Sequence, residues 1–144
     1  MRVVDILKEK GLDVKTVKSG DSIQMLARCL SEEKVGAMVV VGAHGAIDGI
    51  ISERDVIRGL AAYGTKVTTM PVSDLMTKTV ITCSPLDSIL AVTRVMTQRR
   101  IRHLPVIENG KLTGLISMGD LLKHRIEEVE LEANVLRDYT IALR

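Results

Sequence analysis

The chain contains two similar segments in tandem, separated by a nearly constant distance. Asp21-Ser22-Ile23 recurs as Asp87-Ser88-Ile89, 66 positions later (87 − 21). The stretch 49–55, Gly-Ile-Ile-Ser-Glu-Arg-Asp, recurs at 114–120 as Gly-Leu-Ile-Ser-Met-Gly-Asp, 65 positions later (114 − 49). The one-residue difference falls most simply in a turn, where it does not reverse the faces of a strand. Two copies of so short a unit predict two halves about a pseudo-twofold axis, so a site in one half should have a counterpart in the other.

Each copy is predicted to form, in order, a strand, a helix, two strands and a helix. The elements expected in the first copy are a strand at Val14–Val17, a helix from Ser22 to Gly36, strands at Ala37–Val41 and Ile47–Ser52, and a helix opened by Asp55. Those expected in the second copy are a strand at Val80–Thr82, a helix after Pro85–Ser88, strands at Leu104–Ile107 and Leu112–Ser117, and a helix opened by Asp120. The sequence therefore predicts an α/β fold of two β-α-β-β-α repeats.

Two further helices are expected outside the repeats. Val3–Lys10 is predicted as a short leading helix, and His124–Leu143 as a longer one with an apolar stripe. That stripe packs either on the protein's own repeats or on a second copy of the chain. The expected division is residues 12–66 for the first repeat, 67–76 for a polar linker, 77–130 for the second repeat and 131–144 for a C-terminal helix.

Composition limits the function classes. The chain has 144 residues, 46% of them hydrophobic but only 1% aromatic, and a net charge of +2. The core must therefore be aliphatic, and the stacking platforms of a single-strand nucleic-acid binder are missing. Cys29 and Cys83 have no metal-ligand spacing and are interpreted as small buried apolar residues. No apolar run approaches the ~18 residues of a membrane span, and the N-terminus does not resemble a secretory signal, so the cytoplasm is the expected location.

The order of elements, with Gly-apolar-apolar-Ser-x-x-Asp closing each copy, resembles the CBS domain. Two such domains in tandem resemble a Bateman module. The stretches 51–58, Ile-Ser-Glu-Arg-Asp-Val-Ile-Arg, and 100–106, Arg-Ile-Arg-His-Leu-Pro-Val, are both similar to that family. The resemblance covers about residues 12 to 130 and is greatest to small bacterial stand-alone CBS pairs, which carry no enzymatic domain.

The resemblance implies a regulatory module that binds an adenosine-containing ligand in clefts between the repeats and catalyses nothing. AMP is the first choice, with ADP, ATP, NAD and S-adenosylmethionine as alternatives. By the family pattern, Asp55 and Asp120 would take the ribose hydroxyls, and Ser52 and Ser117 would lie near the phosphate.

The residues themselves support this role. Ser52 stands at a strand end and Asp55 in the first turn of a helix, so both side chains can face one cleft. A helix start also offers free N–H groups and a partial positive charge to a phosphate. The competing interpretation makes Asp55 and Asp120 simple N-caps.

Basic residues differ between the copies. Arg54 lies inside the first motif and has Gly119 as its counterpart, whereas Arg102 and His103 precede the core strand of the second copy only. Arg54 from one copy, and Arg102 or His103 from the other, are predicted to reach the phosphates. The alternative is a solvated basic turn, with His103 as a pH-sensitive hydrogen bonder or a polar edge residue.

An apolar slot is required for the adenine ring. The residues expected to line it are Val14, Thr16, Ala37, Met38 and Val39 in one copy, and Val80, Thr82, Leu104 and Pro105 in the other.

Three other functions compete with the regulatory module. An enzyme is disfavoured because the three histidines have no catalytic partner in sequence and no nucleophile or metal motif is present; no catalytic cofactor is expected. A nucleic-acid binder would depend on Arg99–Arg102, a single basic turn. A structural homodimer without a ligand is the third alternative, and a homodimer is the expected assembly in either case.

Overall fold

The computed structural model describes residues 1–11 and 13–143, which separate into two compact units. The first-repeat unit is Asp13–Thr82, and the second-repeat unit combines Met1–Leu12 with Cys83–Arg144. The predicted start of the first repeat at residue 12 and end of the last helix at residue 144 lie outside the described residues. The mixed α/β fold of two tandem repeats is confirmed.

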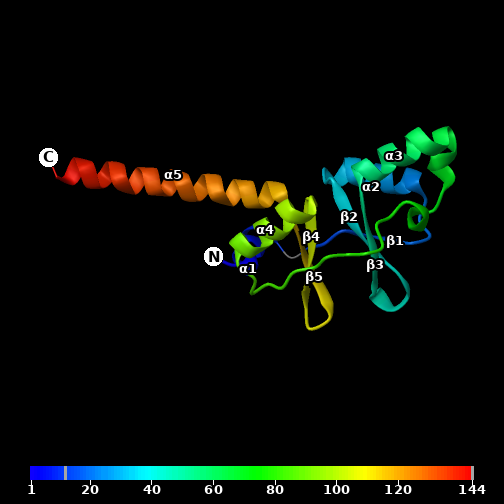
Figure 1. Ribbon diagram of the computed structural model, residues 1–144, viewed down its shortest axis with the longest axis horizontal. Helices are drawn as coiled ribbons and strands as arrows, with labels where there is room; N and C mark the ends of the chain where they lie inside the picture. The colour runs from blue at the N-terminus through cyan, green and yellow to red at the C-terminus, as the bar shows by residue number, and fades with distance from the viewer. Residues whose placement is uncertain (12, 144) are drawn as a thin grey trace. The chain divides into compact units, whose positions relative to one another are not determined.

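The first-repeat unit is a three-stranded sheet with two helices. Its regular elements are β1 (Thr16–Lys18), α2 (Ile23–Glu33), β2 (Ala37–Val41), β3 (Ile47–Ser52) and α3 (Glu53–Tyr63). β2 lies in the centre of the sheet, parallel to β1 and antiparallel to β3, and α2 and α3 pack side by side (Figure 1). The predicted first strand was placed too early, because Val14 precedes β1. The predicted end of the helix at Gly36 was too late, because Lys34 already adopts a left-handed C-cap (φ 55°).

Alternation along β2 separates two sets of buried side chains. Met38 and Val40 belong to the main apolar cluster, whereas Ala37 and Val39 point to the opposite face of the sheet. The cluster also receives buried side chains from β1, α2, β3 and the segment that follows α3, while α3 contributes the partly buried Val56. Its buried members are Val17, Ile23, Leu26, Leu30, Met38, Val40, Ile51, Val67 and Val72.

The segment 67–76, expected to be a polar linker, is part of the packed first-repeat unit. It contains the end of the 3₁₀ helix η2 (Gly64–Thr69) and the whole of η3 (Val72–Asp74), and its Val67 and Val72 are 3% and 0% exposed. The N–H of Val72 donates to the carbonyl of Asp21 at 2.8 Å. Just beyond, Thr77 exchanges backbone hydrogen bonds of 2.9 and 3.0 Å with Ile50 in β3. The segment therefore closes the core of this unit instead of merely connecting the repeats.

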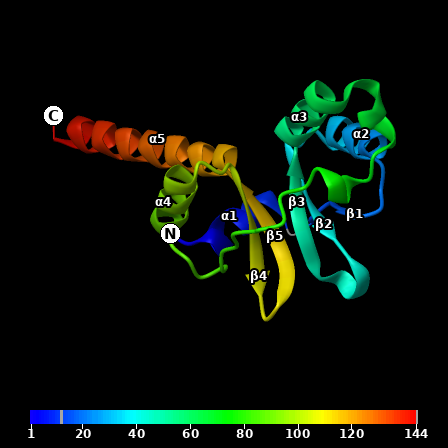
Figure 2. The ribbon, with the colours of Figure 1, turned by 45° about the vertical axis from the view of Figure 1, so that its right-hand side comes forward.

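The second-repeat unit is built around one hairpin. Its regular elements are α1 (Val3–Lys10), α4 (Ile89–Arg99), β4 (His103–Glu108), β5 (Lys111–Ser117) and α5 (Met118–Ala142). β4 and β5 are antiparallel, with His103 opposite Ser117, and the three helices gather around the hairpin (Figure 2). The leading helix 3–10 is confirmed.

The strand predicted at Val80–Thr82 is wrong, and Pro105 on the neighbouring strand β4 supplies the reason. Cys83 alone pairs with β4, donating its N–H to Pro105 (3.0 Å) and accepting from Ile107 (2.9 Å). Toward Val80–Thr82, a parallel ladder would need the N–H of Pro105, and on the other side of Cys83 it would need the N–H of Pro85; proline has no such group. In the first repeat the counterpart of Pro85 is Ser19, and its N–H does donate to Val41 at 3.3 Å.

In each unit, a segment that precedes one of the repeats in the sequence packs against a glycine of a hairpin strand. A Cβ on Gly114 of β5 would lie 2.7 Å from the side chain of Leu7 in α1. A Cβ on the equivalent Gly49 of β3 would lie 2.6 Å from the carbonyl oxygen of Thr77 and 2.8 Å from the sulfur of Met76. The chain's first helix thus packs on the second repeat, and the segment that leads into the second repeat packs on the first.

The last two predicted helices are one continuous helix. α5 runs for 25 residues, from the end of β5 through the segment expected to be a separate helix (Figure 1). Gly119 is its only glycine, and no proline interrupts it. Among the described residues, no helix is both long enough and apolar enough to cross a bilayer.

We expect Gly49→Ala to destabilise the protein more than Gly114→Ala. The new methyl group at 49 meets a backbone carbonyl that is fixed by hydrogen bonds, whereas at 114 it meets the end of the buried Leu7 side chain, which no hydrogen bond fixes. The expected loss for Gly49→Ala is about 1–3 kcal/mol of unfolding free energy, measured by urea denaturation. Gly20→Ala, where nothing lies within 4 Å of the new methyl group, is the control. Equal losses at 49 and 114 would contradict the packing described here.

Candidate functional site

Each Ser-x-x-Asp sequence forms a hydrogen-bonded turn at the point where a hairpin strand becomes a helix. The N–H of Ser52 donates to Asp55 Oδ2 at 2.9 Å, and the N–H of Ser117 donates to Asp120 Oδ2 at the same distance. The serines are the N-caps and the aspartates are the third helical residues, so Asp55 and Asp120 do not open their helices as predicted. The interpretation of these residues as helix caps is therefore correct for each Ser-Asp pair, but the N-cap is the serine and not the aspartate.

Capping leaves part of each carboxylate open. In Asp55, the hydrogen bonds from the backbone and hydroxyl of Ser52 both end on Oδ2, at 2.9 and 3.2 Å. Within the described part of the chain, no hydrogen bond reaches Oδ1 of either aspartate. A carboxylate oxygen at a half-buried helix start is suited to accept from vicinal hydroxyl groups. Capping and ligand binding are therefore compatible roles for the same residue.

The start of the core strand lies next to each of these turns. Ala37 is paired with Ser52 across the first hairpin, and His103 with Ser117 across the second. One residue earlier, the carbonyl of Gly36 accepts from Glu53 N–H at 3.0 Å, and that of Arg102 accepts from Met118 N–H at 2.8 Å. The local geometry of the candidate site is thus duplicated, down to the backbone hydrogen bonds.

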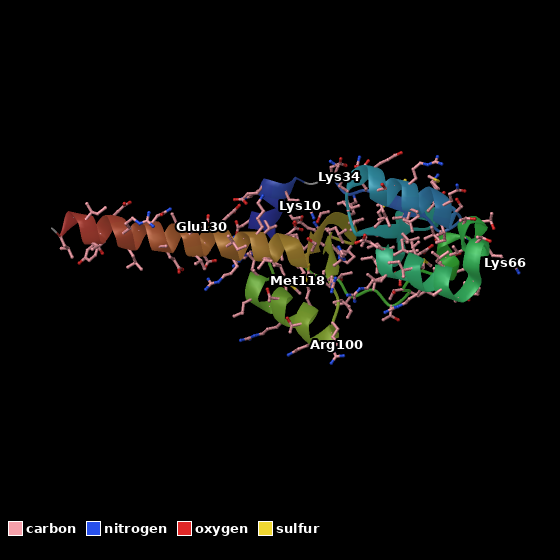
Figure 3. All side chains as sticks on the ribbon, turned by 90° about the horizontal axis from the view of Figure 1, so that it is seen from above. Lys10, Lys34, Lys66, Arg100, Met118 and Glu130 are labelled. Carbon is pink, nitrogen blue, oxygen red and sulfur yellow. The ribbon has the colours of Figure 1, made fainter. Side chains whose placement is uncertain are left out.

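Lys10 distinguishes the second turn from the first. Its ammonium group lies 2.7 Å from Asp120 Oδ2 and 2.7 Å from the carbonyl oxygen of Leu115. Figure 3 shows Lys10 on α1 beside the beginning of α5, where Met118 is labelled. Among the described residues, Asp55 has no such cation. The second carboxylate is therefore neutralised from within its own unit.

The ion pair changes the acidity of Asp120. Burial raises the pKa of this carboxyl group, but the hydrogen bonds from Lys10 and Ser117 and the charge of Lys10 outweigh it, so the pKa lies below its usual value. A small cavity of about 100 Å³ lies alongside, between α1 and α5, and His124 and Glu127 line it together with Lys10 and Asp120. Its volume suits a few water molecules and not a nucleoside.

We expect Lys10→Met to destabilise the protein above about pH 4, the ordinary pKa of an aspartate, with the difference shrinking at lower pH. Because the folded-state pKa of Asp120 is lowered, its stabilising contribution is present above the unfolded-state pKa. It is lost as pH falls through the folded-state pKa. Thermal melts between pH 3 and 7 measure this dependence.

Lys8→Met is the control for that experiment, because Lys8 also lies in the last turn of α1 and is exposed. It removes the same charge from the same helix end without touching Asp120. If both variants lost stability with the same pH profile, the ion pair would not be the cause.

The basic residues predicted to meet phosphates fall into two sets. Arg54 is exposed in the first turn of α3, two residues from Ser52. Arg102 is exposed and His103 half-buried at the start of β4, directly across from Ser117. Each set therefore lies at the Ser-x-x-Asp turn of its own unit.

The residues expected to line the adenine slot differ in burial. Five of the nine are buried core-strand residues: Ala37, Met38, Val39, Leu104 and Pro105. Met38 belongs to the apolar cluster, so it stabilises the fold whichever ligand binds. Thr16 and Thr82 are exposed, and Val14 and Val80 are half-buried.

Both cysteines are free thiols, and only Cys83 is buried as expected; Cys29 is partly exposed. Burial, with a smaller contribution from the charge of Asp87, raises the pKa of Cys83 to about 12. Burial therefore keeps Cys83 in its neutral thiol form.

Sequence reasoning missed Lys10 as a neighbour of the site. The signal was present in a second pair of similar segments, Val3-Val4-Asp5-Ile6-Leu7 and Val72-Ser73-Asp74-Leu75-Met76, 69 positions apart (72 − 3). That similarity shows that each repeat begins earlier than predicted. It does not by itself show on which repeat each segment packs.

The comparison with protein families decides the family. The model of the CBS domain matches residues 3–62 and again residues 72–127. The chain belongs to the CBS-domain family. The two matched CBS domains begin with the two similar segments just described, and each ends beyond its Ser-x-x-Asp turn.

The chain is similar to several known CBS-domain proteins. The chain is 32% identical over 145 residues to the mitochondrial CBS domain-containing protein CBSX3 of Arabidopsis thaliana, covering 95% of this chain and 70% of the relative. The crystal structure of the CBS-domain protein ATU1752 from Agrobacterium tumefaciens is 42% identical, with a TM-score of 0.84 and coverage of 86% and 92% of the two chains. The CBS-domain pair of protein MJ0100, solved with 5′-methylthioadenosine and S-adenosylmethionine, is 25% identical, with a TM-score of 0.79 and coverage of 89% and 98%.

Proposed function

We propose that this CBS pair is a regulatory module of the cytoplasm that binds an adenosine-containing ligand and catalyses no reaction. AMP is the ligand we expect first, with ADP, ATP, NAD and S-adenosylmethionine as alternatives. The observation that carries the proposal is the duplicated Ser-x-x-Asp turn, in which the carboxylate closes the helix through one oxygen and offers the other. The adenosine compounds bound by the MJ0100 pair support the choice of ligand class.

The chemistry of a nucleoside phosphate suits these residues. We propose that ribose hydroxyls donate to the aspartate, while the phosphate meets the helix start, its serine and the nearby basic side chains. Ser52 and Arg54 would take this role at the first turn, and Ser117, Arg102 and His103 at the second. The buried strand residues beside each turn would contribute the apolar contact for adenine.

We propose further that the first turn binds the ribose more tightly. Asp55 carries no internal counter-ion among the described residues, whereas Asp120 is paired with Lys10 at 2.7 Å. A carboxylate already neutralised by an ammonium group is a weaker acceptor, and part of its hydrogen-bonding capacity is used. Asp55 is therefore the residue on which binding should depend most.

Replacement of Asp55 by Asn tests this proposal. The amide still offers an oxygen to the Ser52 N–H, so the protein should fold, while AMP binding should weaken about 10- to 100-fold because a charged hydrogen bond is lost. Calorimetric titration measures the affinity. Glu53→Gln, which removes a negative charge from an exposed residue in the same turn, should leave binding unchanged.

Asp120→Asn should weaken binding less than Asp55→Asn. If Asp55→Asn melts earlier but binds normally, Asp55 is a cap only and the ribose contact is refuted. If AMP, ADP, ATP, NAD and S-adenosylmethionine at millimolar concentration all leave the melting temperature of the ligand-free protein unchanged, the ligand proposal itself fails, and a structural module remains. A specific ligand at a hundredfold excess over Kd stabilises by about 2.7 kcal/mol, which a thermal melt detects readily.

We also propose that the protein is a homodimer, because α5 displays large exposed apolar side chains. Val129 and Leu136, 45% and 66% exposed, would be covered by a second copy. Light scattering at tens of micromolar should give twice the mass of one chain. Val129→Glu with Leu136→Glu should yield a folded monomer, while Leu131→Glu with Val135→Glu, on another face of the same helix, should leave the dimer intact. A monomeric unmodified protein would end this proposal.

A further inference from the structure

The first half of α5 has two different faces. Leu121 is 4% exposed and the side chain of His124 is 12% exposed, because this face packs on the rest of the second-repeat unit. Leu122 and Ile126 are 61% and 50% exposed. At 100° per residue the Leu122–Ile126 stripe lies nearly opposite the packed face, so it is uncovered although it is apolar.

The second half of α5 extends away from its unit. From Val129 to Leu143 every residue is exposed, and Figure 3 shows side chains standing out around the helix beyond the labelled Glu130. Figures 1 and 2 both show the helix reaching past α4 with no element beside its end. A helical segment of this length is only marginally stable alone in water. Its stability and its apolar side chains both require a partner.

The uncovered stripe continues along the whole helix as a heptad repeat. Its members follow one another at alternating steps of four and three residues, the spacing of a coiled-coil seam. The d positions are Leu122, Val129, Leu136 and Leu143, and the a positions are Ile126, Ala133 and Thr140. The remaining exposed apolar residues, such as Leu131 and Val135, continue the packed face instead, and Asp138 interrupts that second stripe.

We propose that α5 pairs with α5 of a second copy as a parallel, in-register, two-stranded coiled coil. Leucine dominates the d positions, and the β-branched Ile126 and Thr140 stand at a positions, a distribution that favours two parallel strands. This inference rests on the proposed homodimer and is independent of the proposed adenosine ligand. It adds which surface pairs, in which direction and in which register.

The charges beside the seam support the parallel direction. In a parallel pair, each g residue faces the e residue five positions later on the other helix. Arg125 then faces Glu130 of the partner subunit, and Glu132 faces Arg137 of the partner subunit, so both contacts and their symmetry mates join opposite charges. An antiparallel pair centred between Val129 and Ala133 would instead bring each Glu130 and each Glu132 against its own copy. In the isolated chain Arg125 donates to the partly exposed Glu128 at 2.7 Å, an intrahelical contact that is easily exchanged.

Disulfide trapping tests direction and register together. With the partly exposed Cys29 replaced by Ser, Leu143→Cys should give a covalent dimer on mild oxidation, because parallel helices bring the two 143 positions together. An antiparallel pair over the same span would hold them roughly 30 Å apart. Ile141→Cys, two residues away at a b position outside the seam, is the matched control and should crosslink far more slowly.

Charge exchange provides a second, independent test. Glu132→Lys places like charges at both symmetry-related contacts with Arg137, and the dimer Kd should rise about five- to thirtyfold by sedimentation equilibrium. Adding Arg137→Glu should restore the original Kd, because opposite charges face each other again.

The outcomes separate this inference from the homodimer on which it rests. Preferential crosslinking at 143 together with rescue by the second charge exchange supports the parallel coiled coil. The coiled coil is overturned, and the homodimer left standing, if the dimer crosslinks equally at 141 and 143. The same holds if its Kd does not change with the charge exchanges at 132 and 137. A monomeric unmodified protein overturns both, whatever the result of nucleotide titrations.

Discussion

The turn from hairpin strand to helix is the interaction on which both units depend. In each, one carboxylate closes the first turn of the helix, and a backbone hydrogen bond ties that turn to the start of the neighbouring core strand. The angle between strand and helix is fixed by these contacts, and with it the position of every apolar residue that the helix contributes. A polar residue at this point is needed for folding alone, so its duplication is not in itself proof of a ligand. What points beyond folding is the carboxylate oxygen that the cap leaves open.

Much of this architecture is predictable from the sequence because the chain repeats itself. Hydrophobic periodicity located the core strands and both repeat helices, and duplication gave the Ser-x-x-Asp turns. The errors arose where backbone hydrogen bonding overrode side-chain pattern. Val80–Thr82 is rich in β-branched residues, but Pro105 lacks the donor that a ladder needs there. Ser52 and Ser117, not the aspartates, cap the helices, a distinction that only the dihedral angles reveal.

Long-range packing was the part that sequence pattern could not supply. Lys10 is separated from Asp120 by 110 positions, and no local rule connects them. The similarity of segments 3–7 and 72–76 shows that they play equivalent roles, but each packs on the repeat that does not follow it in sequence. The resulting neighbours differ, since α1 brings a lysine to the second turn. Two turns that share the Ser-x-x-Asp sequence thus acquire different electrostatics, in part from what packs beside them.

The continuity of α5 links these differences to assembly. Its first turn holds Asp120, and the same helix, uninterrupted after Gly119, carries the seam to Thr140, with Leu143 at the C-cap. No proline or further glycine offers a kink between those points, so we expect a rotation of the first helical turn to reach the seam. The Lys10–Asp120 pair therefore holds the base of the element that carries the proposed dimer contact. A ligand at the Ser52–Asp55 turn lies at the start of α3 instead. It has no such long helix to act on, because α3 ends after 11 residues. If both Ser-x-x-Asp turns bind nucleotide, the nucleotide at the Ser117–Asp120 turn is the one that acts directly on the proposed coiled coil.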